Sequence, residues 1–497
     1  MPKYYLGIDQ GTTGTTALLM NENWDIAGRG YKEQKQYFPK QGWVEQDPME
    51  IYENVLSAVK VAVSSSQAYM HNICCIGIDN QGETVMMWDK QSGQPVYPAI
   101  VWQDTRTAKE ASRIKAVHES IIRKKTGLII NTYFSATKIR WLIDNVADVK
   151  DKIAKGNIQV GTLDTWLIWK LTNGKVCATD QSTASRTMLF NIHTKTWDDE
   201  LLDIFGIQRN LLPEIHDSAY VYGNTDPKEF FGISIPISGN IVDQQAALLG
   251  QNCLIPGTIK TTYGTGCFML MNTGNQPIIS PNGLLTTVGW GLNNNQLTFV
   301  LEAGIYIAGA AIQWLRSGLG IIKTVAESDR LAKSVMDTEG LYFVPAFSGL
   351  ATPYWNQNAR GTIVGITGGI KKEHIVRATL ESIAYQVKDN LDLMEAESGI
   401  QTKVMRVDGG ITANDFLMQF QADILGIPVD VPVINEATAL GAAYLAAIGV
   451  GEINDFESLK SSWRLKKRYE PRIDTSKRDM LLHQWHRAVE RSKNWIE

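Results

Sequence analysis

Three short segments of this sequence carry aspartate, or glycine with threonine, in patterns that suit phosphate binding or phosphoryl transfer. The first is Asp9-Gln10-Gly11-Thr12-Thr13. A glycine lets backbone N–H groups approach an anion closely, threonine hydroxyls can donate to phosphate oxygens, and an aspartate at a strand end can hold a hydrated cation. The chain contains neither the lysine-bearing P-loop pattern nor G-x-G-x-x-G. This segment predicts a phosphate cradle without a lysine, and an ordinary hairpin turn is the alternative.

The second segment places an aspartate between an apolar strand and a helix of small residues. Within residues 241–247, Asp243 follows Val242 and precedes Gln244. A carboxylate at a strand-to-helix junction of an open α/β sheet is well placed to act as a general base or to bridge to a metal ion. The alternative is that Asp243 only caps the helix.

The third segment, residues 407–414, has two adjacent glycines ahead of a helix. Gly409 and Gly410 would let a flat ring or a phosphate lie against the backbone, and Asn414 is a candidate N-cap. A loop that simply ends at an asparagine cap also explains these residues.

Strands and helices must position these segments, and the sequence indicates where they fall. Residues 4–20 and 259–271 each consist of two runs of strand formers around a turn rich in glycine and threonine. The two segments lie about 250 residues apart, which suggests two related halves that face each other. We therefore predict one domain over residues 1–250 and a second over residues 251–497.

Amphipathic helical stretches alternate with β-branched runs along the chain, which indicates α/β layers. Apolar residues at steps of three or four predict a helix over residues 374–398, with Gly399 as its stop. A second helix over residues 415–425 is expected between the Asn414 cap and Gly426. The charged segment near the C-terminus, with Lys466, Lys467 and Arg468 among its residues, predicts a solvated terminal helix.

The composition is that of an ordinary globular protein, with 497 residues, 44% apolar and 20% charged. The net charge of −4 is too small to attract nucleic acid. Five cysteines form neither an even disulfide framework nor paired C-x-x-C metal sites, which favours a reduced compartment. No secretion-signal pattern precedes the first strand, and the apolar run over residues 440–450 is too short to span a bilayer. We predict a soluble cytoplasmic protein without nucleic-acid partners or membrane insertion.

Taken together, these segments resemble the parts of two-lobed ATPases of the actin, Hsp70 and hexokinase type. That resemblance implies a ribonuclease H-like α/β fold with ATP in an interdomain cleft. Longer strings identify a narrower group, since from Tyr4 to about residue 450 the chain is similar to the glycerol kinases of the FGGY carbohydrate kinase family. The strings that carry this similarity are residues 42–50, 99–103, 161–170, 184–194 and 262–274.

The resemblance implies roles for individual residues. Asp243 matches the catalytic base, and Asp9 and Asp243 match the residues that organise Mg²⁺. The positions that match the enclosure of a polyol are Glu83, Trp102, Tyr133, Asp243, Gln244 and Phe268. The positions that match ATP contacts are Thr12, Thr13, Gly264 and Thr265 in two phosphate loops, and Gly309, Gln313, Gly410 and Asn414 around the nucleotide. Family membership would also imply a homodimer or homotetramer. For Arg186, inside the string 184–194, a structural salt bridge is a sufficient explanation.

Two positions depart from the usual family pattern. Thr16 and Gly82 stand where typical glycerol kinases have arginines that hold phosphate and polyol hydroxyls. Our main hypothesis is ATP-dependent phosphorylation of glycerol to sn-glycerol 3-phosphate, with Asp243 as base. Because both arginines are missing, a kinase of the same family acting on another short polyol or a ketose is the alternative. A third hypothesis is a non-enzymatic ATPase of the actin or chaperone kind.

Overall fold

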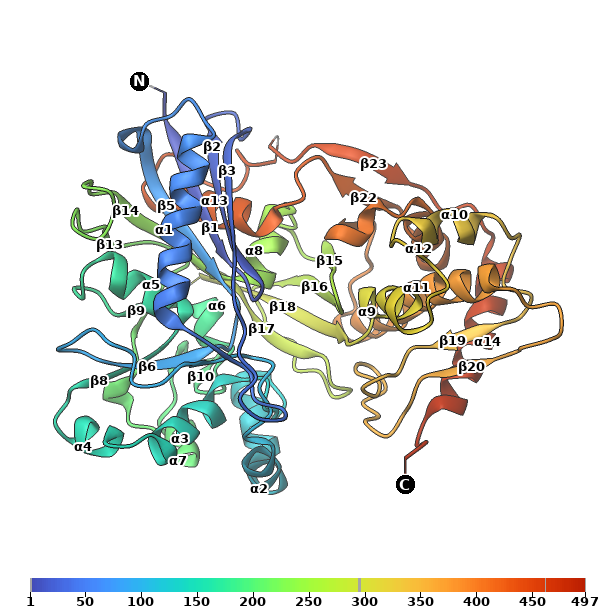
Figure 1. Ribbon diagram of the computed structural model, residues 1–497, viewed down its shortest axis with the longest axis horizontal. Coiled ribbons are helices and arrows are strands. Elements are labelled where there is room, and N and C mark those ends of the chain that lie inside the picture. The colour runs from blue at the N-terminus through green and yellow to red at the C-terminus, as the bar shows by residue number, and fades with distance from the viewer. Residues whose placement is uncertain (1, 294–295, 461, 497) are drawn as a thin grey trace.

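The computed structural model describes residues 2–293, 296–460 and 462–496. Two α/β lobes lie side by side, with the N-terminal half of the chain forming the left lobe in Figure 1 and most of the C-terminal half forming the right lobe. Each lobe is built on one large sheet with helices packed against it. The predicted α/β class with two lobes is confirmed.

The large sheet of the N-terminal lobe (N lobe) has six strands in the order β13-β14-β5-β1-β2-β3. β1, β2 and β3 form an antiparallel meander, whereas β1, β5 and β14 run parallel to one another. The strands are β1 (Tyr4–Gln10), β2 (Gly14–Asn21), β3 (Ile26–Glu33), β5 (Ile73–Asn80), β13 (Ala219–Asn224) and β14 (Pro236–Val242).

The large sheet of the C-terminal lobe (C lobe) has seven strands in the order β17-β18-β16-β15-β21-β22-β23. β15, β16 and β18 are antiparallel, and β15, β21 and β22 are parallel. Three antiparallel strands followed by two parallel strands therefore occur in the same spatial order in both lobes, as expected for two related halves. The strands are β15 (Ile259–Tyr263), β16 (Cys267–Gly274), β17 (Leu285–Leu292), β18 (Gln296–Ile305), β21 (Met405–Asp408), β22 (Val429–Pro432) and β23 (Leu465–Tyr469).

Smaller sheets and further helices complete the two lobes. The remaining strands are β4 (Glu45–Gln46), β6 (Val85–Asp89), β7 (Ala99–Ile100), β8 (Ile158–Thr162), β9 (Ala178–Asp180), β10 (Phe190–Asn191), β11 (Thr196–Trp197), β12 (Glu214–His216), β19 (Tyr342–Val344) and β20 (Thr362–Val364). The helices of the first half are α1 (Pro48–Ser64), α2 (Ala108–Thr126), α3 (Ser135–Asn145), α4 (Val149–Ala154), α5 (Leu163–Leu171), α6 (Gln181–Ala184), α7 (Asp199–Phe205) and α8 (Asp243–Gly250). Those of the second half are α9 (Gly309–Gln313), α10 (Glu327–Lys333), α11 (Lys372–Ser398), α12 (Asp415–Leu425), α13 (Ala437–Gly449) and α14 (Thr475–Ser492).

The predicted elements around the candidate segments are present. β1 and β2 form a hairpin around residues 11–13, and β15 and β16 form one around residues 264–266. α11 begins two residues before the predicted start and ends at the left-handed Gly399, whose φ is 68°. The Asn414 side chain caps α12 by accepting from the Leu417 N–H, as predicted.

The prediction of a solvated terminal helix is wrong in part. Lys466, Lys467 and Arg468 lie on β23, an edge strand of the C-lobe sheet. Charged side chains suit an edge strand because they discourage pairing with another chain. The terminal helix is α14, which starts after this strand and buries Trp485 in the C-lobe core.

Helix α13 belongs to the second half of the chain but packs on the N-lobe sheet (Figure 1). It lies across β1, β5 and β14, where Gly7, Gly77 and Gly239 are side by side. A methyl group at Gly7 or Gly77 would overlap a backbone carbonyl of α13. Helix α13 covers one face of these strands, and α1 packs on the opposite face. As a result, β1 is buried along nearly its whole length.

Across the parts of the chain that the structure describes, no helix combines the length and apolar character needed to cross a membrane. The apolar run over residues 440–450 falls largely within α13, which is 13 residues long.

The glycine contacts under α13 lead to a prediction about stability. Gly77→Ala should lower the free energy of unfolding by about 1–3 kcal/mol, because the added methyl forces helix and sheet apart. Urea unfolding of wild type and variant measures this loss. Gly368→Ala is the control, since a Cβ at Gly368 meets no atom within 4 Å. Equal losses for the two variants would contradict the packing argument.

Candidate functional site

Three aspartates meet at one edge of the N-lobe sheet. Asp9 on β1 and Asp79 on β5 are register partners, and Asp79 also pairs with Ile241 on β14. Asp243 follows β14 directly as the first residue of α8. The three carboxylates are close enough to affect one another's ionisation. They lie at the carboxyl ends of parallel strands, where open α/β sheets bind ligands.

Burial and mutual repulsion raise the pKa values of these carboxyls. Burial, followed by the charge of Asp243, raises the pKa of Asp9 to about 6. Burial and then the charges of Asp9 and Asp243 raise the pKa of Asp79 well above its usual range. The pKa of Asp243 is raised by burial although hydrogen bonds from Gln244 oppose the shift. Like charges in a poorly solvated site destabilise one another, so a cation would stabilise this cluster.

The predicted Mg²⁺ fits this cluster. Asp79 is fully buried, and neither of its carboxylate oxygens accepts a hydrogen bond from the described residues. Within the described ranges, no three His, Cys, Asp or Glu side chains are arranged to enclose a metal ion. Mg²⁺ does not need such a cage, because it keeps several waters and binds one or two carboxylates together with substrate phosphates. Asp9 and Asp243 therefore remain its predicted ligands.

The first predicted phosphate loop is held from outside its own hairpin. The Gln46 side-chain amide donates to the Thr12 carbonyl at 2.8 Å. The Trp102 indole N–H donates to the Thr12 hydroxyl at 2.8 Å. Thr13 is exposed at the tip of the turn. The loop is thus fixed in place and connected directly to an aromatic residue of the predicted polyol site.

The second predicted phosphate loop, with Gly264 and Thr265, is exposed between β15 and β16. The Thr265 carbonyl accepts from the N–H groups of Ala308 and Ala310, each at 3.0 Å. The Gly309 N–H donates to the Gly264 carbonyl at 3.0 Å, and a Cβ at Gly309 would lie 2.5 Å from that oxygen. The predicted contact Gly309 therefore begins α9 directly against this loop.

The other predicted nucleotide contacts lie on neighbouring elements of the C lobe. Gly409 has a φ of 93°, and a methyl there would overlap the Tyr263 carbonyl just before the second loop. Gly410 is exposed with open space around it, and Gln313 is exposed on α9. The Asn414 amide caps α12 and also donates to Ser328 at 3.1 Å. Its predicted contact with a nucleotide stays a prediction.

The predicted polyol residues of the N lobe come together. The rings of Trp102 and Tyr133 meet edge to face with centroids 5.4 Å apart. The Trp102 backbone N–H donates to the Thr84 hydroxyl at 3.2 Å, next to the buried Glu83. Burial raises the pKa of Glu83 to about 7, although Arg186, which donates to Glu83 at 2.6 Å, opposes the shift. Polar groups beside aromatic faces suit a small polyhydroxylated ligand.

Asp243 is not the N-cap of α8, because Val242 occupies that position and Asp243 is already helical. The Asp243 carboxylate accepts from the Gln244 backbone N–H at 2.7 Å and from its side-chain amide at 3.3 Å. The side-chain oxygen of Gln244 in turn accepts from the buried Lys260 ammonium at 2.6 Å. Lys260 on β15 of the C lobe thus fixes which way the Gln244 amide faces Asp243.

A buried lysine lies behind the aromatic pair. The Lys138 ammonium on α3 donates to the Tyr133 carbonyl at 2.7 Å and to the Trp102 carbonyl at 3.5 Å. Burial lowers the pKa of Lys138 to about 7. One side chain therefore ties together the two loops that present the aromatic rings.

The two departures from the family pattern have defined surroundings. Thr16 on β2 is the cross-strand partner of Asp9, so its side chain lies on the face that carries the carboxylate cluster. At Gly82, a Cβ would lie 2.8 Å from a methyl of Val242 and 3.9 Å from the Arg186 side chain. Val242 thus fills the space that a side chain at position 82 would enter.

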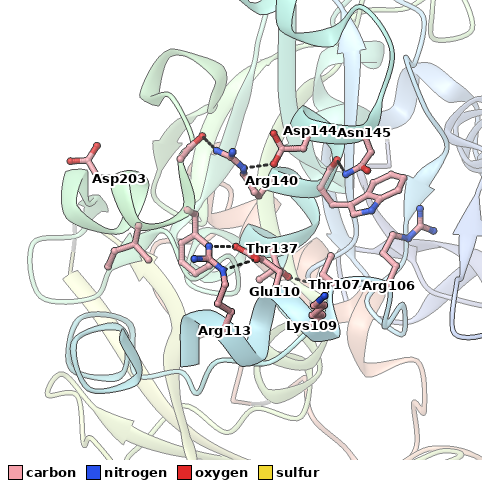
Figure 2. Close-up of a pocket in the computed structure, with 14 residues that line it drawn as sticks. Arg106, Thr107, Lys109, Glu110, Arg113, Thr137, Arg140, Asp144, Asn145 and Asp203 are labelled. Atoms are coloured by element: carbon pink, nitrogen blue, oxygen red, sulfur yellow. Dashed lines mark hydrogen bonds and ion pairs between the residues drawn. The ribbon is translucent and has the colours of Figure 1, made fainter. Parts of the chain in front are cut away.

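A cavity of about 690 Å³ lies outside this site, between α2, α3 and α7 (Figure 2). None of the predicted site residues lines it. Arg113 pairs with Glu110 at 2.7 Å, and Arg140 pairs with Asp144 at 2.6 Å, on its walls. Its arginines are therefore already neutralised by carboxylates, and we do not place the functional site there.

Comparison with known proteins assigns the family. Residues 4–250 match the N-terminal domain of the FGGY family of carbohydrate kinases, and residues 259–450 match its C-terminal domain. The chain belongs to this FGGY family. A glycerol kinase of Pseudothermotoga lettingae is 52% identical over 496 residues, covering 100% of this chain and 99% of the relative. A glycerol kinase of Thermus thermophilus is 51% identical over 490 residues, covering 98% and 99%.

Solved structures agree with this assignment. The structure of Plasmodium falciparum glycerol kinase with ADP has a TM-score of 0.93 and 39% sequence identity, covering 99% of this chain and 98% of that one. A gluconate kinase from Lactobacillus acidophilus has a TM-score of 0.87 at 23% identity, with 99% and 97% covered, which supports the fold alone. The family resemblance and the two-lobed kinase fold stated from the sequence are confirmed.

Three residues of the candidate site carry no role in the sequence analysis. Asp79 carries the same signal as Asp9 and Asp243, since it stands near the end of an apolar strand, and that signal could have identified it. Lys138 and Lys260 gave no signal, because lysines in helices and strands are usually solvated. Their roles depend on partners that only the fold brings close.

The buried Lys138 leads to a prediction about pH. Its pKa of about 7 in the folded chain lies below the ordinary 10.5, so between these values the unfolded chain binds more protons. The free energy of unfolding of the wild type should therefore rise with pH above about pH 7, and Lys138→Met should lose this rise. Urea unfolding at about pH 7 and pH 9 measures the difference. Lys155→Met, at an exposed lysine, should behave as wild type. Parallel pH dependence in wild type and Lys138→Met would contradict the assignment.

Proposed function

We propose that this chain transfers the γ-phosphoryl group of ATP to glycerol and forms sn-glycerol 3-phosphate. The observation that carries the proposal is the identity of about half of all residues with glycerol kinases over the whole chain. The adjacent Glu83, Trp102 and Tyr133 supply the polar and aromatic groups that a small polyol needs. Membership of a carbohydrate kinase family favours this reaction over a filament or chaperone ATPase.

In the proposed reaction Asp243 accepts the proton of the attacking hydroxyl. Its carboxylate is oriented by Gln244, which Lys260 holds from the C lobe. A raised pKa makes Asp243 a stronger base than an exposed aspartate, and the charge of Lys260 favours its ionised form. The general base thus depends on contacts from both lobes.

The two phosphate loops would hold the transferred group between the lobes. Thr12 and Thr13 present hydroxyls from the N lobe, and Gly264 and Thr265 present backbone and hydroxyl groups from the C lobe. Gly309, Gln313, Gly410 and Asn414 are the proposed contacts of the nucleotide. When bound at Asp9 and Asp243, Mg²⁺ would neutralise charge that develops on the phosphoryl oxygens.

The division into domains 1–250 and 251–497 and a homodimeric or homotetrameric assembly are part of this proposal. The division places the two phosphate loops in different domains, which suits closure of the cleft around the substrates.

A kinase acting on another short polyol or a ketose is the second candidate. The observation that favours it is the absence of two positive charges. Gly82 stands next to Glu83 in place of the arginine that would reach polyol hydroxyls, and the neutral Thr16 lies opposite Asp9. Losing a charge-assisted hydrogen bond of about 1.5–3 kcal/mol would weaken glycerol binding about tenfold to a hundredfold.

The test is ADP release on addition of glycerol, dihydroxyacetone, erythritol, xylitol or a pentulose. Glycerol should give the highest kcat/KM, and Asp243→Asn should lower its turnover by about 10²–10⁴-fold while ATP still binds, because the base is lost. Asp199→Asn, at an exposed surface ion pair, is the control and should keep normal turnover. A higher kcat/KM for another substrate would favour the second candidate, and ADP release independent of every polyol would refute both.

The space at position 82 gives a further prediction. Gly82→Arg alone should lower kcat, because its Cβ displaces Val242 next to Asp243. Gly82→Arg combined with Val242→Ala removes the obstacle, so the new arginine should lower the KM for glycerol about tenfold. Steady-state kinetics of Val242→Ala alone provide the matched control. If the double variant instead loses activity on the best substrate and gains none on glycerol, the pocket is shaped for a larger molecule.

A further inference from the structure

Arg186 is a buried arginine whose guanidinium is shared by two carboxylates. Its Nε donates to Glu83 at 2.6 Å, and its two terminal nitrogens donate to Glu302 at 2.6 and 3.0 Å. All three side chains are almost fully buried. A guanidinium that forms two parallel bonds to one carboxylate has a fixed plane, so its Nε–H points in one direction. That direction is toward Glu83.

The surroundings leave Arg186 little freedom to move. Its guanidinium carbon lies 5.6 Å from the centre of the Tyr133 ring and 5.4 Å from that of Phe134. Arg186 follows the short helix α6, whose N-cap is the buried Asp180. Ser185, the preceding residue, shares a hydrogen bond of 2.6 Å with Thr287 on β17. The arginine is therefore anchored on its backbone and on both sides of its side chain.

The second carboxylate links the polyol residues of the N lobe to the C lobe. Glu302 lies on β18, and Gly304, two residues further on, pairs with Phe268 on β16. Residues two apart on a strand share a face, so Glu302 and the predicted polyol contact Phe268 lie on the same side of the C-lobe sheet. The row Glu83, Arg186, Glu302 thus runs from the polyol residues of the N lobe to the face of the C-lobe sheet that carries Phe268.

Glu83 needs such an anchor. It has a φ of 62°, a left-handed conformation uncommon for a residue with a side chain, and it follows Gly82, which has no side chain to brace it. The Ser135 hydroxyl donates to the Glu83 carbonyl at 3.1 Å, which fixes the backbone but not the carboxylate.

We propose that Arg186 is the positioning residue of the polyol site, holding the Glu83 carboxylate toward the substrate hydroxyls and tying it to Glu302 of the C lobe. This inference rests on the proposed function, in which Glu83 contacts the polyol. Three of the five N–H donors of Arg186 bind the two carboxylates, and in this proposal Arg186 acts through Glu83.

The first test is Arg186→Lys, which keeps the charge but cannot bond both carboxylates in one plane. The KM for glycerol should rise about tenfold to a hundredfold, while the KM for ATP stays within about twofold of wild type. Arg377→Met removes another mostly buried arginine pair, with Glu381 on α11, and is the control for general loss of stability. Its KM for glycerol should be unchanged.

The second test asks whether Arg186 acts through Glu83. Glu83→Gln and the double variant Arg186→Lys/Glu83→Gln should show nearly the same kcat/KM for glycerol, because the arginine has nothing left to position. If Arg186→Lys folds poorly, Glu302→Gln tests the same row from the C lobe and should raise the KM for glycerol with that for ATP unchanged. An unchanged KM for glycerol, or losses that add in the double variant, would overturn the proposal.

A pH profile provides a readout that a merely structural arginine would not move. The charged and titratable groups that face Glu83 are Arg186, Lys138, Tyr133, Asp243 and Glu302. With a less well placed cation, Glu83 protonates at higher pH, so the acid limb of kcat/KM for glycerol should move upward in Arg186→Lys. An acid limb at the wild-type pH would count against the proposal. Wild-type enzyme without polyol-dependent ADP release would instead refute the proposed function.

Discussion

The close approach of helix α13 to three parallel strands is the constraint on which the rest of the site depends. Gly7, Gly77 and Gly239 lie in one row beneath the helix, and none of the three has room for a methyl group. Two residues beyond the first two glycines stand Asp9 and Asp79, on the same face of the sheet. The contact that fixes the register of β1 and β5 against α13 therefore also fixes where two of the three carboxylates meet.

The site also solves a problem of charge. Asp9, Asp79 and Asp243 collect negative charge at the sheet edge, and Glu83 and Glu302 add more nearby. Three buried cations face these groups, each held differently: Arg186 between two carboxylates, Lys260 on an amide and a hydroxyl, and Lys138 on backbone carbonyls. Groups that no longer contact water must satisfy one another, so each cation also restricts the geometry of its partners.

Local chemistry made part of this arrangement predictable from the sequence. Turn residues between strand formers predicted both hairpins, and Asn414 with Gly426 predicted the ends of α12, because these signals act within a few residues. The contact of Val242 with Gly82 and the two carbonyls that hold Lys138 join distant parts of the chain, so no local pattern indicates them. Strand β23 was predicted as part of a helix because edge strands and solvated helices are both rich in charged residues.

The hydrogen bond from the Trp102 indole to the Thr12 hydroxyl has a consequence for how two substrates would bind. Trp102 belongs to the proposed polyol site and Thr12 to the proposed phosphate loop, so ordering either side chain also orders the other. A ligand that immobilises Trp102 would spare a nucleotide part of the entropy cost of fixing Thr12, and linkage requires the same benefit in the opposite direction. Such mutual assistance needs no moving lid, because a single bond between two side chains carries it.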